Sequence, residues 1–486
     1  MTPSPVAPDL GPQTGPKSGP QSGPQSGNAL EALSAIFKAY DVRGIVPDQF
    51  SPNTARAVGA AFARFTGAAK IVVARDMRPS GIELSTAFAE GALGEGVDVI
   101  DIGLASTDLL YFASGMLDIP GVTFTASHNP AQYNGAKMCL AGAKPIGEET
   151  GLTEIRDIAA ALLDGDVAFG TGSGTRSEQS LLDAFAKHAL SFIDPAKIRP
   201  LKVVADTANG MGGLVVPAVL GQLPLDLEVM YGELDGTFPN HPADPIQPEN
   251  LRDLQNRVTA VHADIGLAFD GDADRVFLVD ERGQPISGST TTSMVAAAIL
   301  SRNPGATVLY NCICSKAVPE VIRECGGVPV RTRVGHSFIK SVMAETDAVF
   351  GGEHSAHYYF RDNYRADSGI IAALIVLQLL SEAGEGAKLS ELRKPFERYV
   401  GSGEINTKVA SPKAVVERIE SAYTGRNATI DHLDGLTVDF GSWWFNLRAS
   451  NTEPLLRLNL EASNEDECST HVAEVVSLIT GLANVK

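Results

Sequence analysis

Short apolar segments alternate with helical patterns along most of the chain, and this alternation constrains the fold more than any other feature. Ile71–Ala74 and Val97–Ile102 are short and rich in β-branched residues, so both are predicted strands, and Ile82–Glu95 between them is a predicted helix. The same order of strands and helices returns twice before residue 398. Strands that alternate with helices form layered α/β domains.

The two ends of the chain depart from this pattern. Residues 399–486 are predicted to bring five strands together beside two helices, which is typical of an α+β domain. Residues 1–27 repeat a Gly-Pro-x-Ser/Thr tetrad with almost no apolar side chains, so we expect a disordered tail. The predicted organisation is a tail (1–27), three α/β domains (28–174, 175–284 and 285–398) and a C-terminal α+β domain (399–486).

Charge and hydropathy exclude several classes of partner. The net charge of −19 argues against binding to nucleic acid or to an anionic membrane surface, although a local basic pocket could still bind a small anion. The longest apolar run, Ile370–Leu380, is shorter than the ~20 residues that span a bilayer and is a predicted buried helix. The five cysteines suggest no disulfide framework and the first residues resemble no signal peptide, so we expect a cytoplasmic protein.

A serine follows one of the predicted strands at the point where the strand must end. The stretch Thr125–Pro130 comes directly after the apolar segment Gly121–Phe124, and Pro130 cannot continue a strand ladder. Ser127 is therefore expected to be exposed in a loop that a rigid element supports, where a nucleophile can work. The alternative is a polar turn whose hydroxyl binds its own backbone.

Three carboxylates crowd into Asp270–Arg275, between two apolar segments. Asp270, Asp272 and Asp274 would repel one another unless a cation neutralises them, and their hard oxygen ligands suit Mg²⁺. A calcium loop is excluded, because Arg275 occupies the position that requires glycine and because the flanking segments are predicted strands. A solvated acidic turn is the alternative.

Two further loops carry groups that suit a phosphorylated sugar. Gly352–His357 offers a carboxylate, a hydroxyl and two imidazoles, which could bind sugar hydroxyls and supply a proton donor. Arg448–Pro454 offers a guanidinium, hydroxyls and an amide, the set that a phosphate needs. Each could equally be a polar loop. His336 could start a helix or contact a ligand, and Tyr40–Gly44 is expected in a turn.

Taken together, these motifs resemble those of the α-D-phosphohexomutases. Their order along the chain is the order seen in that family, and the resemblance, which is closest to the bacterial phosphomannomutase/phosphoglucomutase branch, extends from about residue 35 to the end. It implies three α/β domains with mixed sheets of the phosphoglucomutase type and a C-terminal α+β domain, in a heart-shaped arrangement with the active site in a central cleft. The motifs are Tyr40–Gly44, Thr125–Pro130, Asp270–Arg275, Gly352–His357 and Arg448–Pro454.

The resemblance also implies a role for each site residue. Ser127 would be the phosphoserine, and a phosphoserine oxygen would bind Mg²⁺ together with Asp270, Asp272 and Asp274. The residues that would line the phosphoryl-transfer site are Arg43, His128, Lys137, Arg275 and His357, of which Lys137 and His357 would transfer protons. The residues that would contact the substrate are Tyr40, Lys316, His336, Glu353, Ser355, Arg448, Ser450, Asn451 and Thr452. The sequence departs from the commoner sugar loop at His354 and Ala356.

The implied reaction interconverts a hexose 6-phosphate and a hexose 1-phosphate, with mannose favoured over glucose. A hexose 1,6-bisphosphate would serve as intermediate and activator, and the enzyme would be a monomer or a homodimer. A phosphoglucosamine mutase is the nearest alternative. A sugar phosphatase with Asp270 as nucleophile, and a non-catalytic sugar-phosphate-binding protein, are alternatives from other classes; Ser127 together with three aspartates counts against mere binding, which needs no nucleophile.

Overall fold

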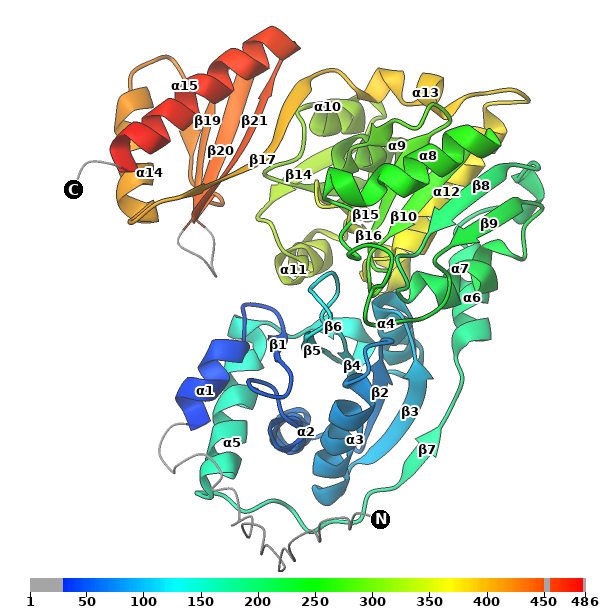
Figure 1. The fold of residues 1–486 in the computed structure, drawn as a ribbon, viewed down its shortest axis with the longest axis vertical. Coiled ribbons are helices and arrows are strands. Elements are labelled where there is room, and N and C mark those ends of the chain that lie inside the picture. The colour runs from blue at the N-terminus through cyan, green and yellow to red at the C-terminus, as the bar shows by residue number, and fades with distance from the viewer. Residues whose placement is uncertain (1–28, 450–454, 484–486) are drawn as a thin grey trace, which may run out of the picture.

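The computed structural model describes residues 29–449 and 455–483 and arranges them around four sheets (Figure 1). Three of these sheets have helices beside them in an α/β arrangement, and the fourth, near the C-terminus, is antiparallel. This confirms the predicted fold class. The predicted tail (1–27) and the predicted phosphate contacts at Ser450, Asn451 and Thr452 lie outside the described residues.

The first domain is built on a mixed sheet with the order β1-β5-β4-β2-β3-β7. Strand β2 is parallel to β3 and β4, whereas β5 runs antiparallel to β4 and β1. The strands are β1 (Val42–Ile45), β2 (Lys70–Arg75), β3 (Asp98–Leu104), β4 (Gly121–Phe124), β5 (Tyr133–Leu140), β6 (Lys144–Pro145, beside β5) and β7 (Arg176–Glu178). The helices are α1 (Ala29–Ile36), α2 (Pro52–Thr66), α3 (Gly81–Gly94), α4 (Thr107–Leu117) and α5 (Leu152–Asp164).

One prediction in this domain was wrong. Tyr40–Gly44 was expected in a turn, but Val42–Ile45 forms strand β1, in which Arg43 lies opposite Gly135 of β5. A four-residue strand that contains both arginine and glycine has too little apolar pattern to be recognised locally. Its position depends on pairing with β5, which lies far along the sequence.

The second domain carries the acidic loop at the end of a hairpin. Its sheet has the order β12-β11-β10-β8-β9, in which β10 is parallel to β8 and antiparallel to β11. The strands are β8 (Lys202–Asp206), β9 (Asp226–Met230), β10 (Ile265–Phe269), β11 (Val276–Asp280) and β12 (Pro285–Ile286). The helices are α6 (Leu182–Leu190), α7 (Gly212–Leu220) and α8 (Arg252–Val261).

The third domain has the sheet order β14-β13-β15-β16. Its strands are β13 (Thr307–Asn311), β14 (Val328–Thr332), β15 (Phe350–Gly352) and β16 (Tyr358–Phe360), and its helices are α9 (Gly288–Arg302), α10 (Ala317–Glu324), α11 (His336–Thr346) and α12 (Gly369–Glu382). Strand β15 begins two residues after the start of the predicted strand Ala348–Phe350. Helix α12 is buried along most of its length, as predicted. Within the described residues, every helix is too short or too polar to cross a membrane.

The C-terminal domain is a five-stranded antiparallel sheet with the order β17-β21-β20-β19-β18. Its strands are β17 (Val400–Lys408), β18 (Thr429–Asp431), β19 (Leu436–Asp439), β20 (Trp443–Ala449) and β21 (Leu455–Ala462). Helices α14 (Pro412–Tyr423) and α15 (Glu465–Ala483) lie beside the sheet (Figure 1). A short helix, α13 (Leu389–Leu392), precedes this domain.

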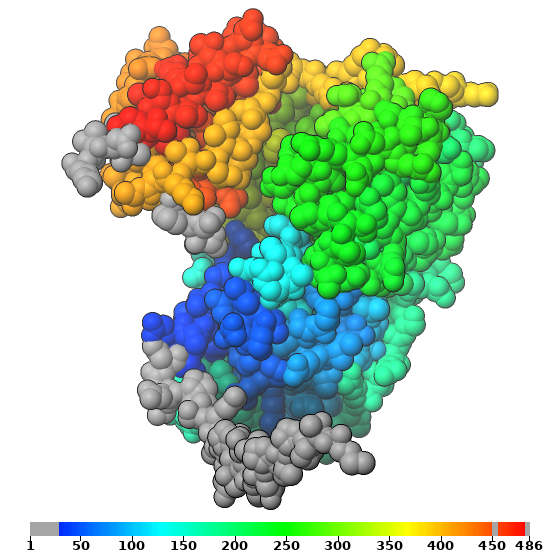
Figure 2. Space-filling view, in the orientation of Figure 1, coloured from blue at the N-terminus to red at the C-terminus, as the bar shows by residue number. Residues whose placement is uncertain are grey.

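The distribution of the cores explains how the domains are held. Val72 and Ala74 of β2 pack into a core that continues through the second and third domains, whereas Ile71 and Val73 face a separate core within the first domain. This alternation follows from the two-residue period of a strand. The C-terminal domain has its own core. Figure 2 shows that the surface is hollowed between this domain and the first domain.

Candidate active site

Ser127 lies in a tight turn three residues after β4. The strand ends at Phe124 as predicted, and Ser127 has a positive φ of 49°, with its N–H donating to Thr125 Oγ1 at 2.9 Å. The side chain is only 3% exposed, however, so the predicted exposure was wrong. The reason is the close approach of the acidic loop: a Cβ atom at Gly271 would lie 2.4 Å from the Ser127 carbonyl oxygen.

A buried arginine that the sequence analysis missed shapes this turn. Arg78, just after β2, donates to the carbonyl oxygens of Ser127 (2.9 Å) and Asn129 (2.7 Å) through Nη2. Its Nη1 donates to the carbonyl oxygens of Pro130 and Tyr133, both at 2.9 Å. The guanidinium fork therefore binds four carbonyl groups of one loop, which a planar group with five donors can do.

The acidic loop places its three carboxylates directly against Ser127. Asp270, Asp272 and Asp274 are buried, and each offers one oxygen within 4.8 Å of those of the other two. Ser127 Oγ donates to Asp270 Oδ2 at 2.8 Å. Burial raises the pKa of Asp270 well above its usual value, with Asp272 and Asp274 adding to the rise against the effect of Arg275. Crowding of the carboxylates therefore adds to the cost of ionising the buried Asp270.

The unused oxygen atoms of this loop fit a metal ion. Among the described residues, Asp272 Oδ1 and Asp274 Oδ1 are buried atoms without a hydrogen-bond partner. Buried carboxylate oxygens normally accept hydrogen bonds, so two in one loop that accept none are a costly arrangement unless a cation binds there. The three aspartates could thus hold a metal, and hard oxygen donors suit a divalent cation.

Lys137 on β5 binds the other oxygens of the same two aspartates. Its ammonium donates to Asp272 Oδ2 at 2.7 Å and to Asp274 Oδ2 at 2.6 Å. Burial alone would lower the pKa of Lys137, but the two carboxylates outweigh it and hold the pKa well above its usual value. Lys137 is therefore positively charged and donates two hydrogen bonds to the acidic loop.

Two arginines and a histidine complete the surroundings of Ser127. Arg275 donates to Asp270 Oδ2 through Nε (2.9 Å) and reaches Ser127 Oγ (3.3 Å) and His128 Nδ1 through Nη2. Burial and the charge of Arg275 keep the pKa of His128 well below its usual value, so this imidazole is neutral. Arg43 is held by Asp41 at 2.8 Å and contacts the side-chain oxygen of Asn129. Four of the five residues predicted for phosphoryl transfer, namely Arg43, His128, Lys137 and Arg275, thus surround the Ser127 turn and the acidic loop.

The sugar loop brings His357 to the edge of this cluster. His357 Nε2 lies 3.6 Å from Asp274 Oδ1, and its Nδ1 lies 3.0 Å from Ser355 Oγ. Glu353 is buried, and its carboxylate accepts from Tyr359 (2.6 Å), Asn311 (3.0 Å) and the N–H of Gly335 (3.1 Å). Both carboxylate oxygens of Glu353 therefore accept hydrogen bonds from other groups of the protein in this structure.

The structure shows the surroundings of Ala356 and His354, the two residues at which the sugar loop departs from its commoner form. Ala356 is buried with a φ of 66°, a left-handed conformation that glycine adopts without strain. His354 pairs through its Nδ1 with Ser289 Oγ of α9 at 2.9 Å.

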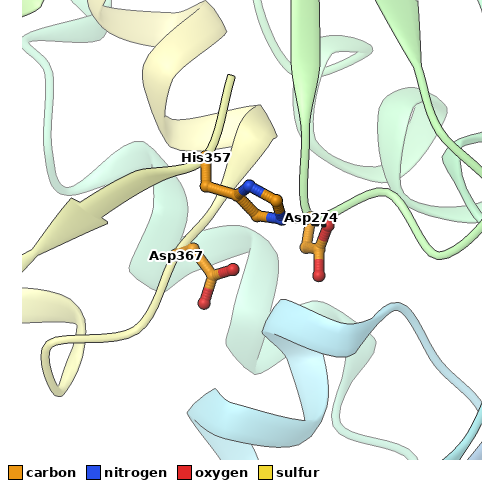
Figure 3. A group of neighbouring side chains, drawn as sticks. All are labelled: Asp274, His357 and Asp367. Carbon is orange, nitrogen blue, oxygen red and sulfur yellow. Dashed lines mark ion pairs between the residues drawn. The ribbon is translucent and has the colours of Figure 1, made fainter. Parts of the chain in front are cut away.

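Figure 3 shows Asp274, His357 and Asp367, whose ligand atoms lie close enough to hold a second ion. Both carboxylates already have a cationic partner, however: Asp274 binds Lys137, and Asp367 Oδ1 lies 3.0 Å from Lys340 Nζ. The Lys340 ammonium beside Asp367 would repel a cation bound between these ligands, so the charge balance disfavours a metal here. Asp367 and Lys340 were not predicted; Asp367 lies close to His357 and pairs with Lys340.

Comparison with known proteins agrees with this geometry. Four family models match in order, described as Phosphoglucomutase/phosphomannomutase, alpha/beta/alpha domain I (residues 34–164), domain II (180–283) and domain III (287–399), and the C-terminal domain (404–478). "Phosphohexose mutases" from Xanthomonas campestris is 41% identical over 451 residues, which cover 92% of this chain and 99% of the relative. The chain belongs to the phosphoglucomutase/phosphomannomutase family.

Two further similarities extend this result. The phosphomannomutase of Escherichia coli K12 is 39% identical over 436 residues, which cover 88% of this chain and 95% of the relative. The crystal structure of a phosphoglucomutase/phosphomannomutase family protein from Burkholderia thailandensis matches with a TM-score of 0.83 and 31% identity, covering 93% of this chain and 98% of that one. The predicted α-D-phosphohexomutase family is confirmed, and the chain is a hexose phosphate mutase, an isomerase.

The remaining predicted contacts of this mutase lie farther from Ser127. Tyr40, from the first domain, meets His336 of α11 edge-to-face with ring centres 5.2 Å apart. Burial keeps the pKa of His336 well below its usual value, and among the described residues its Nδ1 has no hydrogen-bond partner. Lys316 does not join the cluster: its ammonium binds Asp439 Oδ1 at 2.5 Å and the carbonyl of Gly441 at 2.7 Å, both in the C-terminal domain.

Arg448 lies at the end of β20, beside the part of the phosphate loop that is outside the described residues. Its guanidinium is 3.7 Å from Glu404 and 3.8 Å from Asp434. Both are acidic partners, and both distances are longer than a hydrogen bond. The substrate contacts of Arg448 and Lys316 stay predictions.

Proposed function

We propose that this mutase interconverts hexose 6-phosphate and hexose 1-phosphate, with mannose as the favoured sugar, through a phosphoserine at Ser127 and a hexose 1,6-bisphosphate. The observation that carries the proposal is the position of Ser127 Oγ, which donates to Asp270 and accepts from Arg275 inside a cluster of three aspartates. Several relatives, including those from Escherichia coli and Vibrio cholerae, bear the name phosphomannomutase, which supports mannose.

In the proposed reaction a phosphoryl group leaves the oxygen of phosphorylated Ser127 and joins a hydroxyl oxygen of the bound hexose phosphate. The Ser–O–P bond breaks as the new P–O bond forms, the hydroxyl proton passes to a protein group, and the 1,6-bisphosphate results. In the second half the other phosphoryl group returns to Ser127. Arg275, which reaches Ser127 Oγ, and Arg43, which contacts Asn129 in the same turn, would neutralise charge on the transferring oxygens.

The two candidate proton-transfer groups are placed differently. Lys137 is held as an ammonium by Asp272 and Asp274, so it cannot accept a proton in this arrangement, and its raised pKa makes it a weak acid. His357 lies between Ser355 and Asp274, and we assign to it the acceptance of the sugar hydroxyl proton.

We also propose that Asp270, Asp272 and Asp274 hold Mg²⁺ together with an oxygen of phosphorylated Ser127. A bound divalent cation supplies positive charge that stabilises the transferring phosphoryl group. The buried oxygens Asp272 Oδ1 and Asp274 Oδ1 support this assignment, since among the described residues neither has a hydrogen-bond partner.

The phosphatase alternative requires Asp270 to attack the substrate. Asp270 is fully buried, and its Oδ2 already accepts from Ser127 Oγ (2.8 Å) and Arg275 Nε (2.9 Å), while Oδ1 accepts from the Arg275 N–H (3.2 Å). Asp270 is thus occupied by contacts within the protein, and Ser127 Oγ contacts both Asp270 and Arg275, which favours a serine ester.

A coupled assay with mannose 1-phosphate, with and without a catalytic amount of glucose 1,6-bisphosphate, tests the proposal. We expect turnover that the bisphosphate stimulates, and an acid-stable phosphate on the peptide that contains Ser127. Ser127→Ala should abolish turnover; near-normal activity of that variant, or a hydroxylamine-labile phosphate, would overturn the mechanism. Comparing kcat/KM for mannose, glucose and glucosamine phosphates separates this function from a phosphoglucosamine mutase.

A further inference from the structure

The first residue of helix α4 contacts the acidic loop, although it belongs to none of the predicted motifs. Thr107 starts α4 in the domain that carries Ser127, and its side chain is only 1% exposed. The residue that it contacts is Asp272, which lies between β10 and β11 in the next domain. A contact between two domains therefore lies directly at a proposed metal ligand.

Thr107 holds Asp272 at both its backbone and its side chain. The N–H of Thr107 donates to the Asp272 carbonyl oxygen at 3.0 Å, and the Thr107 hydroxyl donates to Asp272 Oδ2 at 2.5 Å. The N–H groups in the first turn of a helix have no acceptor within the helix, so this donor is free to bind another loop. Ser106, the N-cap, accepts from the N–H of Leu109 (3.4 Å) and leaves the N–H of Thr107 for Asp272.

The two hydrogen bonds from Thr107 also place the negatively charged acidic loop at a favourable end of helix α4. The N-terminal end of a helix carries partial positive charge, which favours nearby anions. The acidic loop approaches α4 at this end through Asp272, and burial there would by itself raise the pKa of Asp272. The Lys137 charge and the hydrogen bonds from Lys137 and Thr107 outweigh burial and lower that pKa, so the carboxylate is ionised.

The hydroxyl of Thr107 decides which oxygen of Asp272 remains available. Thr107 and Lys137 (2.7 Å) both donate to Oδ2, which fixes the rotation of the carboxylate. Its other oxygen, Oδ1, is buried and has no hydrogen-bond partner within residues 29–449 and 455–483. Hydrogen bonds from Thr107 and Lys137 thus occupy Oδ2 of Asp272, and Oδ1 is the oxygen that could bind a cation.

We propose that Thr107 is a positioning residue for the metal site: its hydroxyl holds Asp272 Oδ2 so that Oδ1 faces a divalent cation. The inference rests on the proposed assignment of Asp272 as a metal ligand. Loss of a hydrogen-bond partner of a metal ligand typically weakens metal binding by about 10–100-fold. Because Thr107 and Asp272 belong to different domains, the same contact ties the position of the Ser127 domain to the metal loop.

The test measures Mn²⁺ binding to the full-length dephosphorylated protein by the electron paramagnetic resonance signal of free Mn²⁺. Thr107→Val removes the hydroxyl and keeps the shape and the backbone N–H, whereas Thr107→Ser restores a hydroxyl. Asp272→Asn tests the ligand itself. Thr292→Val is the matched control, since Thr292 in α9 is buried and, among the described residues, its hydroxyl has no partner.

We expect Thr107→Val to bind Mn²⁺ about tenfold more weakly or worse, while Thr107→Ser and Thr292→Val stay close to wild type. Thr107→Ala, which loses the same donor without any risk of a clash, is measured alongside in case the valine variant does not fold. A purely structural role would lower the melting temperature of the metal-free protein and leave the affinity of the folded protein unchanged.

Two results would overturn the inference, and they differ. If wild type binds Mn²⁺, Asp272→Asn does not, and Thr107→Val and Thr107→Ala bind as wild type does, the metal site stands and the role of Thr107 fails. If wild type and Asp272→Asn bind Mn²⁺ equally, or neither binds it, the proposed metal site itself fails and the role of Thr107 fails with it.

Discussion

Arg78 Nη2 lies 2.9 Å from the carbonyl oxygen of Ser127, and this hydrogen bond joins the end of β2 to the turn that carries the proposed nucleophile. The same guanidinium binds three further carbonyls of the turn, and its Nε pairs with the buried carboxylate of Asp76 at 3.2 Å. Ser127 needs a left-handed backbone conformation, which costs a non-glycine residue energy. Arg78 offsets that cost by binding the turn in this shape.

Arg78→Lys is therefore expected to lower the free energy of unfolding by about 3–5 kcal/mol, because lysine cannot bind several carbonyls at once and leaves buried acceptors without donors. Urea unfolding measures the stability. The mass of the protein after incubation with glucose 1,6-bisphosphate measures phosphorylation of Ser127. We expect this phosphorylation to fall together with the stability.

The control for this substitution is Arg257→Lys in α8. Arg257 is 45% exposed on its side chain and pairs with Glu228 at 2.6 Å, so its replacement should cost less than about 1 kcal/mol. Equal stabilities of the two variants would show that the contacts of Arg78 contribute no more than a surface ion pair does.

Asp108, the second residue of α4, gives a pH-dependent prediction. Its carboxyl is buried, accepts from Ser368 of the third domain at 2.6 Å and pairs with Ser106. Burial raises the pKa of Asp108 to about 7, from 3.8. Between these two values the folded state binds the proton that the unfolded state has released, so this group stabilises the fold at low pH and loses that effect as pH rises to about 7.

Asp108→Asn removes the titration and keeps the shape of the protonated carboxyl. Relative to wild type, its free energy of unfolding should rise by up to about 1.4 kcal/mol per pH unit between pH 4 and 7. Urea unfolding at several pH values measures this difference. A constant difference across that range would mean that Asp108 titrates normally in the folded protein.

The sequence predicted much of this site because the relevant signals are local. Asp270–Arg275 lies between two apolar strands that pair directly with each other, so the loop and its ends are contiguous in the sequence. Ser127 follows a strand that ends where Pro130 requires it to end. Such features need no knowledge of distant contacts.

What the sequence did not reveal depends on contacts between distant segments. Arg78 and Thr107 carry no motif, and their roles appear only when the Ser127 turn and the acidic loop are brought against them. The burial of Ser127 likewise depends on Gly271, which lets the acidic loop approach its carbonyl. For Arg78 the only local signal was a group of charged residues, Arg75, Asp76 and Arg78, at the end of a strand.

Ala356 provides a test of strain in the sugar loop. Its φ of 66° is costly for alanine by about 1–2 kcal/mol, whereas glycine adopts it freely but loses more entropy on folding. Ala356→Gly should therefore raise the melting temperature slightly, in line with a net gain of up to about 1 kcal/mol. Ala218→Gly inside α7 should have the opposite sign. A loss of stability in both variants would contradict strain at Ala356.

Lys340 and Asp367 form a buried ion pair behind His357, with 3.0 Å between Nζ and Oδ1. The ammonium also lies 3.6 Å from the ring centre of Tyr111 in the first domain, so it joins two domains as well as two charges. Burial raises the pKa of Asp367, but Lys340 together with His357, His336 and Lys137 outweighs this and lowers the pKa, so the carboxylate stays ionised.

Lys340→Met leaves the charge of Asp367 buried without a partner and should destabilise the protein by about 3–5 kcal/mol. Adding Asp367→Asn removes that charge, so the double variant should recover part of the loss, and urea unfolding of all four proteins gives the coupling energy. Lys197→Met, at an exposed pair with Glu382 (2.7 Å), should cost less than about 1 kcal/mol. Strictly additive effects of the two buried substitutions would show that the 3.0 Å pair carries no energy of its own.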